Sequence, residues 1–169
     1  TTQATVNLTY AKKIGFDIHG VIDKNPELFS EIIKEFRKHG FEIHILTGSL
    51  IDDDIIKELH SYDIEYDYLF SILGYHKEHK TQMWKDDKGW WINDDVWNMT
   101  KANYCHRLGI IFHLDDTKAY GRHFFKPIFG HITPIKSNPR ILELPEKIDL
   151  EVLEIFTKYE GYYVIQMNG

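Results

Sequence analysis

Several features that identify common classes of protein are missing from this sequence. It has a single cysteine, Cys105, so no disulfide can form within the chain, and a lone thiol suits a reducing compartment. No apolar run approaches the roughly 20 residues that a membrane-spanning helix needs. Residues 1–7 lack the charged and apolar regions of a signal peptide. We therefore expect a cytoplasmic protein without a membrane partner.

An excess of positive charge is missing too. The net charge is −6, so the chain has no general basic field for a phosphate backbone, and nucleic acid is not an expected partner. The 169 residues are 43% hydrophobic and 14% aromatic, which is enough to build a core. Linkers, repeats and low-complexity tracts are missing as well. We therefore expect residues 1–169 to form one domain, whose oligomeric state the sequence leaves open.

Short apolar runs alternate with helical patterns along the chain, which predicts an α/β fold with a parallel sheet and helices on both faces. The expected strands are residues 13–18, 41–46, 68–73, 110–114, 128–134 and 162–166. The expected helices are residues 26–39, 52–59, 101–108 and 150–156.

A segment at about residues 74–98 interrupts this alternation and indicates a small flap. Trp84 precedes a turn-like stretch at residues 85–89, and Trp90 and Trp91 follow it, a pattern typical of a hairpin. The tryptophans could form a small hydrophobic cluster under a long loop. They could instead belong to a lid that offers aromatic and cationic groups to a substrate.

Two of the expected strands end in acids. Asp17 follows the apolar residues 14–16, and Asp115 and Asp116 follow residues 110–114. An unpaired carboxylate at the end of an apolar strand is costly inside a core. At the carboxyl edge of a parallel sheet, however, carboxylates from adjacent strands can hold a divalent cation. The pattern therefore indicates an active site at that edge.

In this order, the motifs resemble those of the haloacid dehalogenase-like (HAD) hydrolase superfamily, most of whose members are magnesium-dependent phosphatases. The four matching motifs are, in chain order, Asp17-Ile18-His19-Gly20-Val21, Thr47-Gly48, Lys101 near an expected helix start, and Asp115-Asp116. The resemblance covers residues 14–117. It implies a Rossmann-like three-layer fold with strand order 5-4-1-2-3, and without a large cap domain the site should be open.

The resemblance also implies a mechanism. Asp17 would attack phosphorus to form an aspartyl phosphate, which splits one difficult transfer into two easier ones. Mg²⁺ would be the cofactor, bound by Asp17, Asp115 and the backbone carbonyl of His19. Asp116 would not bind the metal directly but would orient Lys101 or a metal-bound water.

The phosphate itself would be bound by the second and third motifs. Lys101 would place its charge against the phosphate and Asp17. The Thr47 hydroxyl and the backbone N–H of Gly48 or Ile18 would bind the remaining phosphate oxygens. We expect a small phosphorylated molecule as substrate, with a nucleotide or a sugar phosphate as the first candidates.

His19 is the one departure from the phosphatase pattern, because phosphatases of this family have a second Asp there as general acid and base. Imidazole has an unperturbed pKa of about 6.5, which suits both duties. Three hypotheses remain open: an active phosphatase or phosphotransferase, another reaction of the superfamily, and a phosphate-binding or regulatory protein with little turnover.

Two further residues receive no role in this reaction. Asp23 is interpreted as a cap for the helix that begins at Pro26. His113 alternates with the buried residues of its strand.

Overall fold

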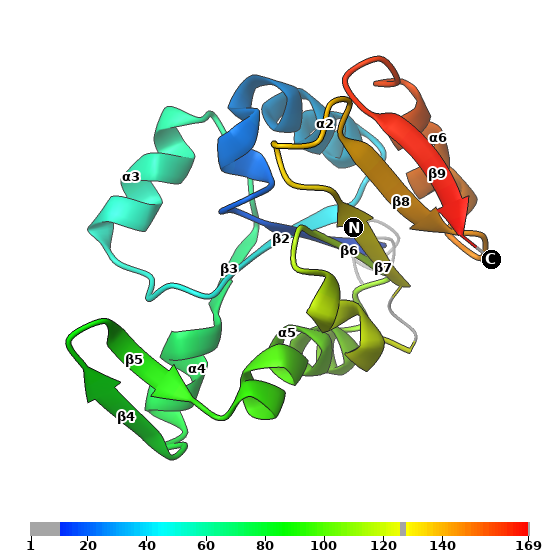
Figure 1. The fold of residues 1–169 in the computed structure, drawn as a ribbon. Helices are drawn as coiled ribbons and strands as arrows, with labels where there is room; N and C mark the ends of the chain where they lie inside the picture. Colours follow the sequence, from blue (N-terminus) through cyan, green and yellow to red (C-terminus); the bar gives the residue numbers. More distant parts are fainter. Residues whose placement is uncertain (1–10, 126–127, 169) are drawn as a thin grey trace, which may run out of the picture.

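A seven-stranded sheet lies at the centre of the structure (Figure 1), which is a computed structural model describing residues 11–125 and 128–168. Its order is β3-β2-β1-β6-β7-β8-β9. The strands are β1 (Lys13–Asp17), β2 (Glu42–Thr47), β3 (Tyr68–Ser71), β6 (Phe112–Asp115), β7 (Ile128–Ile132), β8 (Ile141–Pro145) and β9 (Val164–Asn168). Neighbouring strands are parallel except β7 and β8. Residues 1–7, in which we expect no signal peptide, lie outside the described residues.

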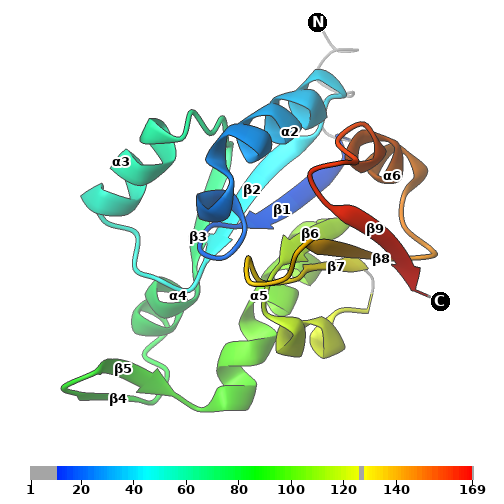
Figure 2. The same cartoon turned by 45° about the horizontal axis from the view of Figure 1, so that its top comes forward.

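Helices cover both faces of this sheet. They are α2 (Pro26–Lys38), α3 (Asp53–Ser61), α4 (Ile72–Glu78), α5 (Asp94–Leu108) and α6 (Leu150–Thr157), with short 3-10 turns η1 (Ile22–Lys24) and η2 (Lys118–His123). Figures 1 and 2 show α2 and α6 on one face and α5 on the other. The α/β class with a mostly parallel, helix-flanked sheet, which the alternating pattern predicts, is therefore confirmed as a Rossmann-like arrangement.

Strand β1 lies inside the sheet, between β2 and β6, and packs against the core. The rings of Phe29 and Phe36 on α2 pack edge-on against Phe16, with centroids 6.3 and 5.9 Å away. Since a central parallel strand is covered on both faces, its residues must be apolar or small up to the strand's end. This packing fixes the position of the strand that ends at Asp17.

Helix α2 begins as expected at Pro26, but its cap differs from our interpretation. The Asn25 side chain accepts a hydrogen bond from the Leu28 N–H, and Pro26 occupies the first helical position. Asp23 accepts instead from the Gly20 N–H at 2.7 Å. Asp23 therefore stabilises the loop after β1 rather than the helix.

The chain around residue 72 also differs from the expectation. Residues 72 and 73, expected at the end of a strand, begin α4, because the Ser71 side chain accepts from the Gly74 N–H and caps the helix. Strand β8 was not predicted. It pairs with β7 and β9 and extends the sheet at the edge opposite β3.

The expected flap contains a two-stranded hairpin, β4 (Met83–Asp86) and β5 (Gly89–Ile92). Trp84 lies opposite Trp91 across the strands, and Trp90 lies near the ammonium groups of Lys77 and Lys85. All three tryptophans are exposed, so they do not form a buried cluster. Figure 2 shows the hairpin projecting from the body of the structure beside α4.

Helix α5 starts seven residues earlier than the expected helix at 101, so Lys101 lies in its middle and not near its start. The start is set by Asn93, whose side chain accepts from the N–H groups of Asp95 and Val96. The first half of the helix was missed because Thr100, a polar residue, is the one buried residue in 94–100, so these residues show no apolar periodicity. Gly109, with a φ of 72°, ends the helix as expected.

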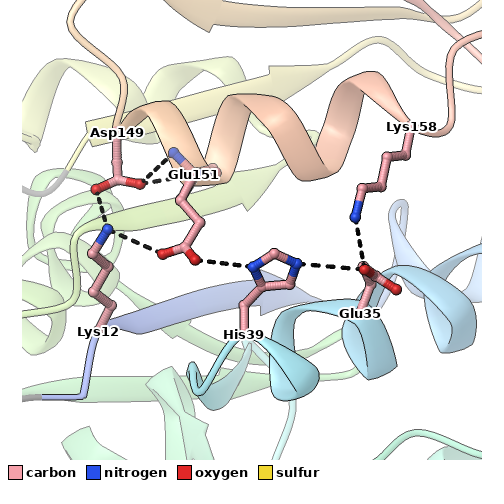
Figure 3. A network of polar contacts seen from close by, with 7 residues as sticks. Lys12, Glu35, His39, Asp149, Glu151 and Lys158 are labelled. Atoms are coloured by element: carbon pink, nitrogen blue, oxygen red, sulfur yellow. Dashed lines mark hydrogen bonds and ion pairs between the residues drawn. The ribbon is translucent and has the colours of Figure 1, made fainter.

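Helices α2 and α6 are joined at the surface by a chain of ion pairs (Figure 3). Glu151 accepts from Lys12 and His39, and Glu35 accepts from Lys158. Within residues 11–125 and 128–168, no helix is both long and apolar enough to cross a bilayer.

Candidate active site

Two aspartates and a lysine meet at the carboxyl ends of β1 and β6. These parallel neighbours end at Asp17 and Asp115, whose residues are 6% and 0% exposed. Lys101 reaches them from α5 and is 2% exposed. Its Nζ donates to Asp17 Oδ1 at 2.9 Å and to Asp115 Oδ2 at 2.7 Å. Asp17 and Asp115 therefore share the ammonium group of Lys101, although they lie 84 and 14 positions from it along the chain.

The shared ammonium affects the two carboxyl groups differently. Burial raises the pKa of Asp17 well above its usual range, an effect that Lys101 opposes and the charge of Asp115 reinforces. Burial acts the same way on Asp115, but Lys101 and a hydrogen bond from His113 outweigh it and lower the pKa. Burial favours the neutral amine of Lys101, yet the two carboxylates raise its pKa. Asp17 is therefore the less well neutralised acid.

Asp116 lies against the loop that follows β1. A Cβ atom on Gly20 would come within 2.0 Å of Asp116 Oδ2, and Gly20 has a φ of 99°. Both facts require glycine, because other residues rarely adopt such a φ and no side chain would fit. Burial and the charge of Asp115 raise the pKa of Asp116. The Lys101 ammonium donates to Asp17 and Asp115, and one Asp116 oxygen lies within 4.8 Å of an oxygen from each of these two acids.

The three carboxyl groups fit the requirements of a hard divalent cation. One oxygen from each of Asp17, Asp115 and Asp116 lies within 4.8 Å of the other two. Mg²⁺ prefers oxygen ligands and is usually bound by one or two carboxylates, with waters and phosphate oxygens in the remaining positions. One ammonium cannot neutralise three carboxylates, and the charges of Asp115 and Asp116 add to the effect of burial, which is the main cause of the raised pKa of Asp17. The donor set is therefore suitable for Mg²⁺.

The second motif forms the neighbouring part of the site at the end of β2. Thr47 is 1% exposed, and its Oγ1 accepts a hydrogen bond from the Ser49 N–H at 3.3 Å. The Thr47 hydroxyl proton is free of that bond and can be donated. Gly48 follows it beside the same pocket. The Ile18 side chain is buried in the core, so only its backbone belongs to the site loop.

These residues line a pocket of about 370 Å³. Its lining residues are Asp17, His19, Thr47, Gly48, Ser49, Leu73, Trp97, Lys101, Thr117 and Tyr120. The pocket therefore brings together the residues expected at the ends of the first two strands and the lysine of the third motif. Figure 2 shows α3 and the β4–β5 hairpin on the side of the structure toward which β1 points.

An aromatic wall beside the acids was not predicted. The Trp97 indole N–H donates to the Tyr120 hydroxyl at 2.9 Å, and the Tyr120 ring lies 5.3 Å from Lys101 Nζ. Trp97 also packs on Gly48, where a Cβ atom would come within 2.9 Å of the indole ring. Trp97 was given no role from the sequence, and its position one turn before Lys101 on α5 is the sequence signal that could have identified it.

His19 lies at the edge of the pocket. Its side chain is 44% exposed, and its Nε2 lies 3.1 Å from Glu58 Oε1 on α3. The Glu58 carboxylate also accepts from the Tyr62 hydroxyl at 2.9 Å. The imidazole is thus tethered to α3, and its residue lines the same pocket as Asp17.

No protein-family model matches this chain, and a search of curated proteins finds no relative. Function is therefore inferred from the chemistry of these side chains and from the resemblance of the four motifs.

The pocket combines a carboxylate, an ammonium group and hydrogen-bond donors. Asp17 is a carboxylate at the floor of an open pocket, with a buried ammonium beside it and a suitable cation site around it. Hydroxyl and backbone donors of Thr47 and Gly48 line the pocket, together with the Trp97 ring that packs on Gly48. Such a site can bind a phosphate and present a nucleophile to it.

Proposed function

We propose that this chain is a magnesium-dependent phosphomonoester hydrolase or phosphotransferase of the HAD-like superfamily, acting through an aspartyl phosphate on Asp17. The observation that supports this most strongly is the bridge from Lys101 to both Asp17 and Asp115 at the ends of adjacent parallel strands. Structural ion pairs are seldom buried in this way, whereas a phosphoryl-transfer site needs opposite charges held close together.

The strand order gives further support. The five expected strands up to residue 134 correspond to β1, β2, β3, β6 and β7, and the sheet contains the series β7-β6-β1-β2-β3. This series matches the order 5-4-1-2-3 that the resemblance implies. A short loop with η1 separates β1 from α2, which is consistent with a site that no large cap covers.

In the first step, an Asp17 carboxylate oxygen forms a bond to phosphorus while the ester P–O bond breaks. The electron pair of that bond leaves with the alcohol oxygen, which takes a proton from protonated His19. In the second step, neutral His19 accepts a proton from water, whose oxygen attacks phosphorus. The Asp17–phosphorus bond then breaks, which releases phosphate and regenerates the carboxylate.

Other residues hold the reacting groups in place. Lys101 orients Asp17 and presents positive charge to the phosphate, and Thr47 and the Gly48 N–H donate to its oxygens. Asp17, Asp115 and the His19 carbonyl would hold Mg²⁺, which when bound neutralises charge on the carboxylates and the phosphate. Asp116 adds a third carboxylate oxygen to this cluster.

The pocket favours a small phosphorylated molecule with a flat group. Its volume of about 370 Å³ suits a ligand of metabolite size, and the Trp97 ring on one wall offers a face for stacking. A nucleotide meets this description better than a sugar phosphate. Trp84 and Trp91 lie opposite each other on the hairpin and are exposed, and closure of the hairpin over the pocket would cover such a ligand with aromatic surface.

The experiment that tests this proposal is phosphate release from a panel of nucleotides and sugar phosphates, with Mg²⁺ or with a chelator. The parent protein should release phosphate only with Mg²⁺. Asp17→Asn should abolish the release and keep the fold, because an amide cannot attack phosphorus. An Asp17→Asn variant as active as the parent would overturn the assignment of the nucleophile.

The tether between His19 and Glu58 favours the second candidate, a phosphate-binding protein with little turnover. His19→Ala tests this choice. If the imidazole is the acid and base, the rate should fall by roughly two to four orders of magnitude, and His19→Asp should keep or raise activity. A binding protein would show no release in the parent or in His19→Ala, and only His19→Asp could gain activity.

A further inference from the structure

His113 lies behind the acid cluster and has no part in the mechanism above. It is fully buried on β6, two residues before Asp115, so both side chains project from the same face of the strand. Its ring stacks on Phe124, with centroids 5.8 Å apart and planes at 9°. On the other side, a Cβ atom on Gly15 would come within 2.8 Å of His113 Nδ1. The imidazole is held tightly between β1 and Phe124.

The two ring nitrogens have different surroundings. Nε2 lies 2.8 Å from Asp115 Oδ2, whereas Nδ1 is buried without a hydrogen-bond partner among the described residues. An ionised carboxylate oxygen only accepts hydrogen bonds, so the proton in the contact with Asp115 is on Nε2. His113 is therefore a hydrogen-bond donor to Asp115.

The hydrogen bond from His113 reduces the number of acceptor positions that remain free on the Asp115 carboxylate. Oδ2 accepts from Lys101 Nζ at 2.7 Å and from His113 Nε2 at 2.8 Å, so both of its lone-pair positions are used. Oδ1 accepts from the Thr117 N–H at 3.0 Å and has one position left. A carboxylate anchored through three donors can no longer rotate about its χ2 angle without losing them.

We propose that His113 is a positioning residue, which fixes the Asp115 carboxylate so that Oδ1 is the oxygen available to a divalent cation. This inference rests on the proposed function, because it assumes that Asp115 is a metal ligand. It assigns His113 a role that neither its place in the strand nor the four motifs indicate. Partners that orient metal ligands in this way are typically worth 10- to 100-fold in metal affinity.

The test is direct binding of Mn²⁺, as a paramagnetic stand-in for Mg²⁺, measured by electron paramagnetic resonance without substrate. His113→Leu keeps the apolar packing on Phe124 and removes the donor, so Mn²⁺ binding should weaken by about 10- to 100-fold. His113→Gln can place an amide N–H near the position of Nε2 and should recover most of the affinity. His44→Leu is the matched control, because His44 is also buried in the sheet but contacts Glu42 and Tyr104.

Two further results decide the inference. If His113→Leu does not fold, His113→Asn replaces it, because its shorter amide cannot reach Asp115 and should bind Mn²⁺ less well than His113→Gln. Equal affinity in the parent and the donor-free variant, or in the Gln and Asn variants, would overturn the positioning role and leave the proposed function intact. A parent that binds no Mn²⁺ would overturn the metal-dependent function and this inference with it.

Discussion

Two polar networks in this molecule use the same kinds of side chain in opposite surroundings. In the surface network of Figure 3, Lys12 donates to Asp149 at 2.9 Å and to Glu151 at 3.1 Å, and its side chain is 44% exposed. In the buried network, Lys101 donates to Asp17 and Asp115 at nearly the same distances, and it is 2% exposed. Each lysine therefore bridges two carboxylates, and the two networks differ in their exposure to solvent.

That difference changes what each network does. At the surface, water and salt screen the charges, and such pairs are worth at most about 1 kcal/mol each. In the buried network, each charge has lost its hydration, so an imbalance between acids and bases is costly. A fold that keeps three acids around one buried ammonium maintains an expensive site, and binding of a cation and a phosphate is the simplest use for it.

Removing the lysine should give the largest contrast between the networks. Lys101→Met leaves two buried carboxylates without their cation, so the free energy of unfolding should fall by about 3–5 kcal/mol and phosphate release should be lost. Lys12→Met should lower the free energy of unfolding by less than about 1 kcal/mol and leave phosphate release unchanged. Urea denaturation and the phosphate assay measure both variants. Equal losses of stability would show that burial does not distinguish the two networks.

Replacing an aspartate by asparagine should change the free energy of unfolding in opposite directions in the two networks. Because burial raises the pKa of Asp17, its ionised form destabilises the metal-free fold at pH 7, so Asp17→Asn should raise the free energy of unfolding by about 1 kcal/mol. Asp149→Asn keeps the cap of α6 but loses the charge that faces Lys12, and should lower it by up to about 1 kcal/mol. Urea titrations with a chelator present decide the signs, and a loss in both variants contradicts this prediction.

The smallest effect concerns pH. Although burial alone would raise it, the pKa of Asp149 is lowered in the fold by its hydrogen bond from Lys12. A depressed folded pKa gives stability that is present above the unfolded value, about 3.9, and is lost as the pH falls through the folded value. The difference in unfolding free energy between the parent and Asp149→Asn should therefore be present at pH 7 and shrink below about pH 4. A difference that is constant from pH 7 to pH 3 would show that charge is not its cause.

The two halves of α5 show where the sequence is informative and where it is not. Its end at Gly109 was predicted, because a glycine after a helical pattern is a local signal for the positive φ that ends a helix. Its start was missed, because residues 94–100 contribute only Thr100 to the buried face of the helix and so lack the apolar periodicity on which the prediction relies.

Local pattern determined much of this protein. Apolar strands that end in Asp17 and Asp115, a strand that ends at Thr47, and alternating helices are enough to predict a parallel sheet with acids at its carboxyl edge. These features depend on neighbours a few residues away, so the sequence displays them directly.

Only the tertiary structure decided which groups meet. The bridge from Lys101 to Asp17, the pairing of Trp97 with Tyr120 and the contact of Glu58 with His19 each join different elements of the chain. His113 has its partner Asp115 nearby in sequence, but the contact matters because Phe124 and Gly15 enclose the ring. Such contacts depend on how helices and strands pack in three dimensions, and spacing along the chain does not encode that packing.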